Sequence, residues 1–222
     1  MSDTIKLSAA DGHTFSAYVA RPLGKPRGAI IVVQEIFGVN HHIKSVTDRF
    51  TNDGYVAIAP ALFDRFERNV DMGYTPETIA LGRKIKVQVT TEMAMADLAA
   101  TRDAVSEAGK LGIVGYCWGG FVTWLASAYL DGISCAVPYY GGGMLEHQEI
   151  VPRVPVMAHF GERDAIIPVV GVKQLAARHP SHKFFIYAAD HGFNCDERGS
   201  YDRAAADLAR ERTLDFFRLH VG

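Results

Sequence analysis

The stretch GIVGYCWGG, residues Gly112 to Gly120, decides the fold of this chain. An apolar run stops at Gly115, presents one cysteine, and continues through two glycines into a further apolar segment. A nucleophile on a tight strand-to-helix turn needs strained backbone angles, and residues two before and two after it must lack side chains. Gly115 and Gly119 stand at those positions, so the stretch predicts a nucleophile elbow with Cys117 at its tip.

The segment that follows the elbow, residues 121–130, is mostly apolar and is predicted to be a helix. The N-terminus of a helix carries free N–H groups and the positive end of the helix dipole. Both would face Cys117 and favour its thiolate form. The alternative is an ordinary buried cysteine that packs like a small apolar residue, but the flanking glycines favour the catalytic interpretation.

Length and composition limit the class of protein. A chain of 222 residues is expected to form a single domain over residues 1–222. A formal net charge of −2 argues against binding to nucleic acid or to anionic lipid. No apolar run approaches membrane-spanning length, the first residues do not resemble a signal peptide, and the three cysteines show no pairing pattern. We therefore expect a cytoplasmic protein.

Apolar segments alternate with helical patterns along the rest of the chain. Continuously apolar strands are typical of a parallel sheet covered on both faces, and a turn at Asp11-Gly12 predicts an N-terminal antiparallel hairpin. Strands are expected at residues 4–7, 14–19, 29–33, 55–59, 133–137, 154–160 and 183–187. Helices are expected at 42–53, 91–108, 121–130 and 201–220, and a further helical signal begins at Pro76-Glu77. Residues 60–76 are expected to form a lid or an irregular loop. The fold class is α/β, with a mostly parallel central sheet and helices on both faces.

Polar residues follow three predicted strands, the first of which ends at the elbow. Their order along the chain is Cys117, then Glu162 or Asp164, then His191. Nucleophile, acid and histidine follow one another in this order in α/β-hydrolases. The histidine would take the thiol proton and later deliver one to the leaving group, while a carboxylate holds its tautomer. Asp164 is preferred to Glu162 because it lies further into its loop and has the shorter side chain.

An oxyanion hole is expected from two backbone N–H groups, those of Trp118 and Ile36. Ile36 lies in the loop QEIFG that follows the strand at residues 29–33. The aromatic residues Phe37, Phe63 and Tyr140 at strand ends either line a substrate pocket or fill the core, and the sequence leaves both readings open.

Four motifs together resemble the dienelactone hydrolase (carboxymethylenebutenolidase) family: QEIFGVN at 34–40, GYCWGG at 115–120, YYG at 139–141 and HGF at 191–193. The resemblance extends over essentially the whole chain and implies the α/β-hydrolase fold, with Cys117, Asp164 and His191 as the triad. It also implies that Glu35 accepts a hydrogen bond from the resting thiol and swings away when substrate arrives. A nearby carboxylate would keep the thiol unreactive until then.

The chain departs from the family pattern beside the histidine. The family places a serine directly after it and, four residues after it, an arginine that helps to hold the substrate carboxylate. This chain has Gly192 and Cys195 at those positions. Arg198 or Arg83 could replace that arginine, although both could equally be solvated surface charges.

The leading hypothesis is a cysteine hydrolase that opens activated esters, above all lactones or enol-lactones, through an acyl-thioenzyme. A general carboxylesterase or thioesterase would use the same residues. A ligand-binding or redox-sensing protein could use Cys117 without catalysis, but it would have no reason to keep all three triad residues. No histidine spacing indicates a metal site, and no cofactor is expected. The expected partner is a small ester or lactone, bound by a monomer or a weak homo-oligomer.

Overall fold

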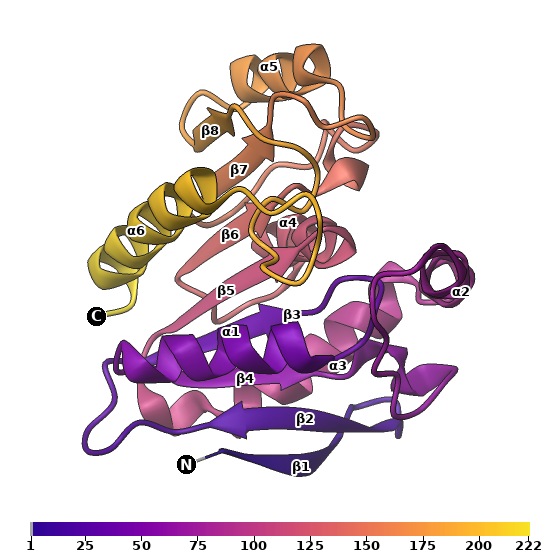
Figure 1. Ribbon diagram of the computed structural model, residues 1–222. Helices are drawn as coiled ribbons and strands as arrows, with labels where there is room; N and C mark the ends of the chain where they lie inside the picture. The colour runs from indigo at the N-terminus through magenta and orange to yellow at the C-terminus, as the bar shows by residue number, and fades with distance from the viewer. Residues whose placement is uncertain (1) are drawn as a thin grey trace.

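The structure, a computed structural model, describes residues 2–222. Eight strands form one sheet (Figure 1), and their bounds are β1 (Ser2–Ser8), β2 (Thr14–Ala20), β3 (Ala29–Val33), β4 (Val56–Pro60), β5 (Leu111–Tyr116), β6 (Cys135–Tyr139), β7 (Met157–Gly161) and β8 (Lys183–Tyr187). The helices are α1 (His41–Asn52), α2 (Pro76–Lys86), α3 (Thr91–Ala104), α4 (Trp118–Tyr129), α5 (Val169–Arg178) and α6 (Arg203–His220). Three short 3-10 turns are η1 (Leu62–Arg65), η2 (Ser106–Ala108) and η3 (Gly142–Met144).

The strands lie in the order β1-β2-β4-β3-β5-β6-β7-β8. β1 and β2 form the predicted antiparallel hairpin, with Ser8 opposite Thr14 across the turn, and β2 also runs antiparallel to β4. All remaining pairs are parallel. The predicted α/β class, with its mostly parallel sheet and N-terminal hairpin, is confirmed.

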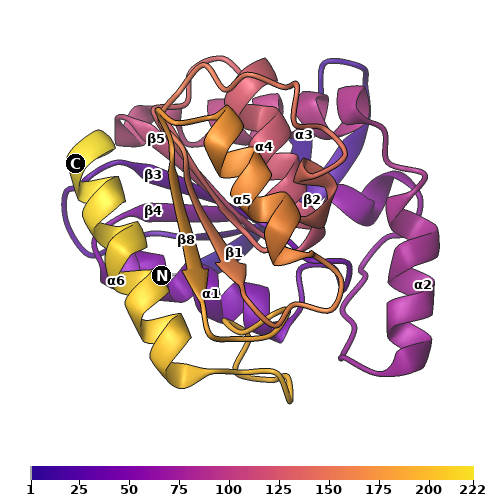
Figure 2. The same cartoon turned by 90° about the horizontal axis from the view of Figure 1, so that it is seen from above.

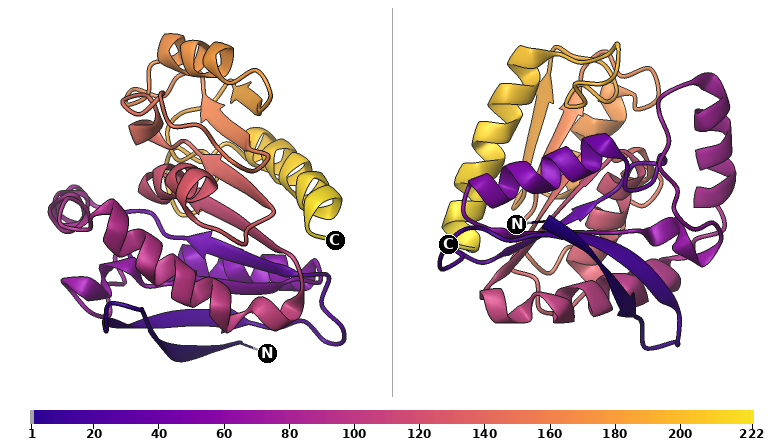
Figure 3. Two further views of the ribbon diagram at one scale, coloured as in Figure 1. Left: turned by 180° about the vertical axis from the view of Figure 1, so that it is seen from behind. Right: turned by 60° about the horizontal axis from the view of Figure 1, so that its bottom comes forward.

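Helices cover both faces of the sheet. α1 and α6 lie on one face, where the rings of Phe50 and Phe217 meet at 5.7 Å, and α3, α4 and α5 lie on the other (Figures 2 and 3). Every residue of β3, β5 and β6 is consequently buried. Burial on both faces explains why these strands are continuously apolar rather than alternating.

The segment between β4 and α2 is packed rather than loose. Asp64 in η1 accepts hydrogen bonds from the backbone N–H groups of Ser16 (2.8 Å) and Asn69 (3.3 Å). Arg65 forms a two-pronged pair with the fully buried Asp97 of α3, at 2.7 and 3.0 Å. These bonds fix the start of the segment and leave α2 as the projecting element at the rim of the molecule (Figure 2).

α2 begins at Pro76, where the sequence carries a helical signal. The Thr75 hydroxyl caps it by accepting from the backbone N–H of Thr78, and the Thr78 hydroxyl accepts from the backbone N–H of Thr75. Pro76 occupies the first turn. No helix within residues 2–222 is long and apolar enough to span a membrane.

Candidate active site

The turn between β5 and α4 has the geometry of a nucleophile elbow. Cys117 adopts φ 54° and ψ −117°, a strained conformation for a residue with a side chain. A Cβ atom at Gly119 would lie 2.3 Å from the carbonyl oxygen of Gln34, and one at Gly115 would lie 2.1 Å from that of Gly119. Strand, helix and the loop after β3 can approach this closely only because both positions lack side chains.

Three loops bring the remaining candidates to Cys117. His191, which follows β8, places Nε2 3.3 Å from the Cys117 sulfur and Nδ1 2.7 Å from Asp164 Oδ2. The other oxygen of Asp164 accepts from the backbone N–H groups of Ile166 (2.8 Å) and Ile167 (3.0 Å), which fixes the carboxylate. Glu162, the alternative acid, is exposed.

The protonation of His191 follows from these contacts. Its burial acts to lower its pKa, but the hydrogen bonds and negative charges of Asp164 and Cys117 outweigh burial and raise the pKa to about 10. At neutral pH the imidazole is therefore protonated beside the Cys117 sulfur. A positively charged imidazole at this distance is the partner that an activated cysteine nucleophile would require.

The two expected oxyanion donors lie next to Cys117. Trp118 is the first residue of α4, Ile36 follows β3, and both line the same cavity as Cys117. Within residues 2–222, neither backbone N–H donates a hydrogen bond to another part of the chain. Both donors are available to a negatively charged oxygen.

The cavity above Cys117 has a volume of about 360 Å³, which is in the usual range for small-molecule sites. Among the described residues that line it, besides Cys117 and His191, three carry positive side chains, Arg83, Lys86 and Arg198, and none is acidic. The remaining wall is largely apolar and comprises Ile36, Phe37, Ile79, Val87, Val89, Trp118, Phe121, Gly142, Gly143 and Ile166. α2 supplies Arg83 and Lys86, so the projecting helix forms one side of the site.

Comparison with known proteins gives a consistent family. A sequence profile of the dienelactone hydrolase family matches residues 15–221. The chain belongs to this family. A carboxymethylenebutenolidase from Pseudomonas putida is 32% identical over 239 residues, covering 97% of this chain and 96% of its own. A Synechocystis protein that carries the same name provisionally is 35% identical over 227 residues, covering 93% and 92%.

Solved structures agree with the sequence comparison. A Klebsiella pneumoniae protein provisionally assigned as a dienelactone hydrolase superimposes with a TM-score of 0.85 at 30% identity, covering 98% of both chains. The architecture is thus the α/β-hydrolase fold of the dienelactone hydrolases. The family consists of hydrolases that cleave ester bonds, and the chain belongs to that class of enzyme.

Two aromatic residues expected as pocket candidates do not line the cavity. Phe63, 1% exposed, packs behind Trp118 with ring centres 5.2 Å apart. Tyr140 is fully buried, and its ring lies 5.2 Å from that of His191. Both support residues of the site from behind, so the core-filling alternative is correct for them. Phe37 does line the cavity, as expected.

Arg198 occupies a position that the sequence suggested only as one of two options. Its guanidinium lies 5.9 Å from the ring centre of Phe37 and 5.6 Å from that of Tyr74, and Nη1 lies 3.4 Å from Glu35 Oε1. Gly192, at φ +77°, leaves the space for it. The glycine next to the histidine therefore accounts for the position of the arginine.

The expected hydrogen bond between Glu35 and the resting thiol is absent, and this expectation was wrong for the structure described. One oxygen of Glu35 pairs with Arg198, while the other has no hydrogen-bond partner within residues 2–222. The Cys117 sulfur contacts His191 instead. The guanidinium explains the difference, since it offers the buried carboxylate a positively charged donor, a stronger partner than a neutral thiol.

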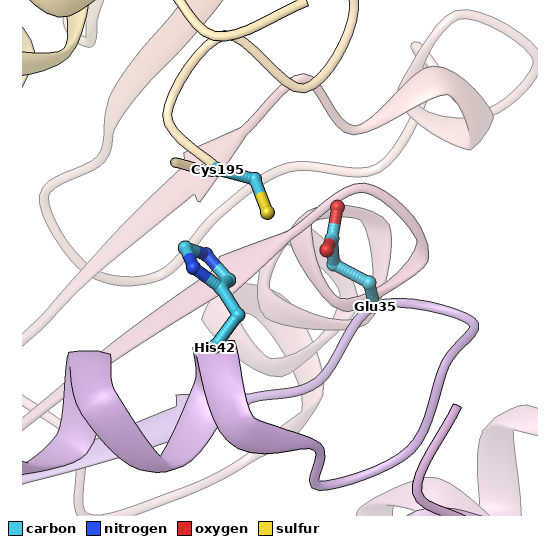
Figure 4. Close-up of side chains that lie close together, drawn as sticks. All are labelled: Glu35, His42 and Cys195. Carbon is cyan, nitrogen blue, oxygen red and sulfur yellow. The ribbon is translucent and has the colours of Figure 1, made fainter. Parts of the chain in front are cut away.

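A second cluster of reactive side chains lies behind Glu35. Ligand atoms of Glu35, His42 and Cys195 lie within 4.8 Å of one another, and all three residues are buried (Figure 4). Burial and the charge of Glu35 raise the pKa of Cys195 to about 12. Sequence spacing did not reveal this cluster, because its members come from the loop after β3, from α1 and from the loop after β8.

Proposed function

We propose that this protein is a cysteine-dependent hydrolase of activated esters, with lactones and enol-lactones as its preferred substrates. The observation that carries the proposal is the chain of contacts from Cys117 to His191 (3.3 Å) and from His191 to Asp164 (2.7 Å) at the floor of a cavity. Each side chain has the partner that its role in acyl transfer requires.

The reaction begins with attack of the Cys117 thiolate on the ester carbonyl carbon. The carbonyl oxygen becomes an oxyanion that accepts hydrogen bonds from the N–H groups of Ile36 and Trp118. As the C–O bond breaks, protonated His191 donates its proton to the leaving oxygen, and an acyl-thioenzyme remains. Neutral His191 then takes a proton from water, and the resulting hydroxide adds to the thioester carbon. The C–S bond breaks, which expels the Cys117 thiolate and releases the carboxylic acid product.

The charge of the cavity supports an acidic substrate. Arg83, Lys86 and Arg198 surround an apolar space whose described lining residues include no acidic side chain, although Arg198 is paired with Glu35 behind the wall. A small unsaturated ring that bears a carboxylate would place its apolar part against Phe37 and Phe121 and its charge toward these cations. This fits a lactone acid better than a neutral ester.

The proposal is tested with Cys117→Ala and, as a matched control, Cys135→Ala, which removes another free cysteine, in β6. On a dienelactone and an activated aryl ester, Cys117→Ala should lower kcat by about 10⁴-fold or more, as loss of a triad nucleophile does. Cys135→Ala should keep most of the activity. Undiminished turnover by a correctly folded Cys117→Ala variant would remove the assignment.

Two alternatives give different results in related experiments. A general carboxylesterase or thioesterase would hydrolyse neutral aryl esters or thioesters at least as fast as acidic lactones. A redox sensor would show only oxidation adducts on Cys117 by mass spectrometry after mixing with substrate. The hydrolase should instead show an acyl adduct on Cys117 in rapidly quenched samples.

A further inference from the structure

The cluster behind the active site contains two buried polar atoms that lack hydrogen-bond partners among the described residues, beside a thiol that contacts Tyr74. Figure 4 shows the side chains of Glu35, His42 and Cys195 pointing toward one another from three separate segments. Glu35 is 1% exposed, and His42 and Cys195 are fully buried. Within residues 2–222, Glu35 Oε2 and His42 Nε2 have no hydrogen-bond partner. Leaving two buried polar atoms unpaired costs free energy, so their common orientation calls for a group that binds both.

The tautomer of His42 makes it a ready ligand. Its Nδ1 lies 3.1 Å from Asp196 Oδ1, and a carboxylate can only accept, so Nδ1 carries the proton. Nε2 then presents its lone pair to the cluster. A histidine held by a carboxylate on one nitrogen, with the other nitrogen free, is the arrangement that orients metal-binding histidines.

The donor set indicates which kind of cation would fit. Oxygen, nitrogen and sulfur donors together suit zinc and similar transition ions, whereas calcium and magnesium prefer oxygen alone. Bond lengths near 2.0–2.3 Å place the ligands of a tetrahedral zinc roughly 3.2–3.8 Å apart. Because the three ligand atoms already lie within 4.8 Å of one another, side-chain shifts of about 1 Å would complete the site.

The charges also balance. A Glu35 carboxylate and a Cys195 thiolate supply two negative charges, and neutral His42 adds none. A divalent cation cancels both, while the charges of the neighbouring Arg198 and Asp196 offset each other. Glu35 would use Oε2 for the cation, because Oε1 faces Arg198 at 3.4 Å. The cation and the guanidinium would then hold opposite ends of one carboxylate.

We propose that Glu35, His42 and Cys195 form a binding site for a divalent transition ion of the zinc type. On binding, the Cys195 S–H bond breaks, the proton passes to solvent, and a sulfur–metal bond forms without any change of oxidation state. Water fills the fourth position. The sequence indicated no metal, so this site departs from that expectation. It requires no ester turnover and is therefore independent of the proposed function.

Cobalt(II) is the probe, because its complexes with thiolates give an intense charge-transfer absorption that zinc complexes lack. The titration uses full-length Cys117→Ala, which removes the other thiol that sits beside a histidine. We expect the absorption to saturate at one cobalt per chain and to disappear when zinc is added. It should be lost in Cys117→Ala/Cys195→Ser and retained in the control Cys117→Ala/Cys135→Ala.

The remaining ligands are tested in the same background. His42→Gln and Glu35→Gln should each weaken cobalt binding at least about tenfold, and Asp196→Asn, which removes the support of His42, by about 10- to 100-fold. Circular dichroism identifies any variant that fails to fold. If Cys195→Ser does not fold, His42→Gln decides the question.

The site is disproved if folded Cys117→Ala shows no cobalt–thiolate absorption, or if the absorption survives the added Cys195→Ser substitution. If the Cys195→Ser variant does not fold, an undiminished absorption in His42→Gln disproves the site instead. Loss of the absorption in the Cys135→Ala control would equally overturn it, since the thiolate would then belong to β6. Turnover is measured in none of these experiments, so failure of the ester-hydrolase proposal would leave their outcome unchanged.

Discussion

Gly192 and Arg198 share one space: a Cβ atom at position 192 would lie 2.4 Å from Nη1 of Arg198 and 2.8 Å from its Cζ. The family resemblance predicted a serine at the first position and an arginine at the position of Cys195. The two departures are related, because the missing side chain at 192 admits a guanidinium from further along the loop. Arg198 thereby brings to the cavity the charge that position 195 lacks.

Gly192→Ala should therefore be costly. The new methyl group meets the guanidinium, and the positive φ of +77° strains any residue with a side chain, which together should destabilise the fold by about 1–3 kcal/mol in urea denaturation. Gly192→Ala/Arg198→Ala removes the clash but keeps the backbone strain. The double variant should consequently lose less stability than the sum of the single losses. Strictly additive losses would show that the two residues do not compete for space.

Asp164→Asn should change both rate and pH dependence. An amide cannot hold the imidazole tautomer or stabilise its positive charge, so kcat should fall about 10³–10⁴-fold. Since Asp164 helps to raise the pKa of His191 to about 10, the alkaline limb of kcat/KM should lie near pH 10 in the parent enzyme and move toward lower pH in the variant. An unmoved limb would contradict the assignment of that limb to His191.

The free energy of unfolding should also depend on pH through the protonation of His191. The pKa of His191 is higher in the folded chain than its ordinary value of 6.5, so the folded state holds this proton more tightly. Its contribution to the free energy of unfolding is complete below about pH 6.5 and is lost as pH rises through about 10. Urea denaturation across this range should show a decline in stability that is smaller in Asp164→Asn.

The cationic side of the cavity should affect binding of acidic substrates selectively. Arg83→Ala and Lys86→Ala should each raise KM for an acidic lactone about two- to fivefold, with an effect that weakens in high salt, and leave KM for a neutral aryl ester nearly unchanged. Lys84→Ala is the matched control, because Lys84 lies on the same helix but does not line the cavity. Equal effects of all three variants on both substrates would argue against charge selection.

Arg65 and Asp97 should contribute strongly to stability. Their side chains are only 8% and 0% exposed, so Arg65→Met leaves a buried carboxylate without its cation and should cost about 3–5 kcal/mol. Lys44→Ala breaks an exposed pair with Asp71 and should cost less than about 1 kcal/mol. Urea denaturation of both variants gives the comparison, and similar losses would show that burial does not set the energy of these pairs.

Much of the fold was accessible from the sequence because its signals are local. The strands at 29–33 and 183–187 have the predicted bounds, since continuous apolar runs end there at polar or turn residues. The elbow could be recognised because glycines at fixed spacing are a direct steric requirement of the turn. The chain order of Cys117, Asp164 and His191 predicted their convergence, since parallel strands end at the same edge of the sheet.

Other features depend on contacts between distant segments and left no local signal. α5 was not predicted as a separate helix. Asp97 lies on the buried side of α3 because Arg65, 32 residues earlier, neutralises it. That both Arg83 and Arg198 would reach the cavity, and that Glu35 would face His42 and Cys195, depended on how distant segments pack together. Spacing along a chain does not encode such packing.

The projecting helix α2 has a consequence for how this enzyme can change. It contributes Ile79, Arg83 and Lys86 to the cavity wall, yet the proposed nucleophile, histidine, acid and oxyanion donors all come from other segments. Part of the cavity wall can therefore vary in a segment that carries none of the proposed catalytic groups. Exchange of residues 76–86 among relatives offers a route to new ester specificities as long as Gly82 is kept, since a Cβ atom there would lie 2.0 Å from the carbonyl oxygen of Ile36.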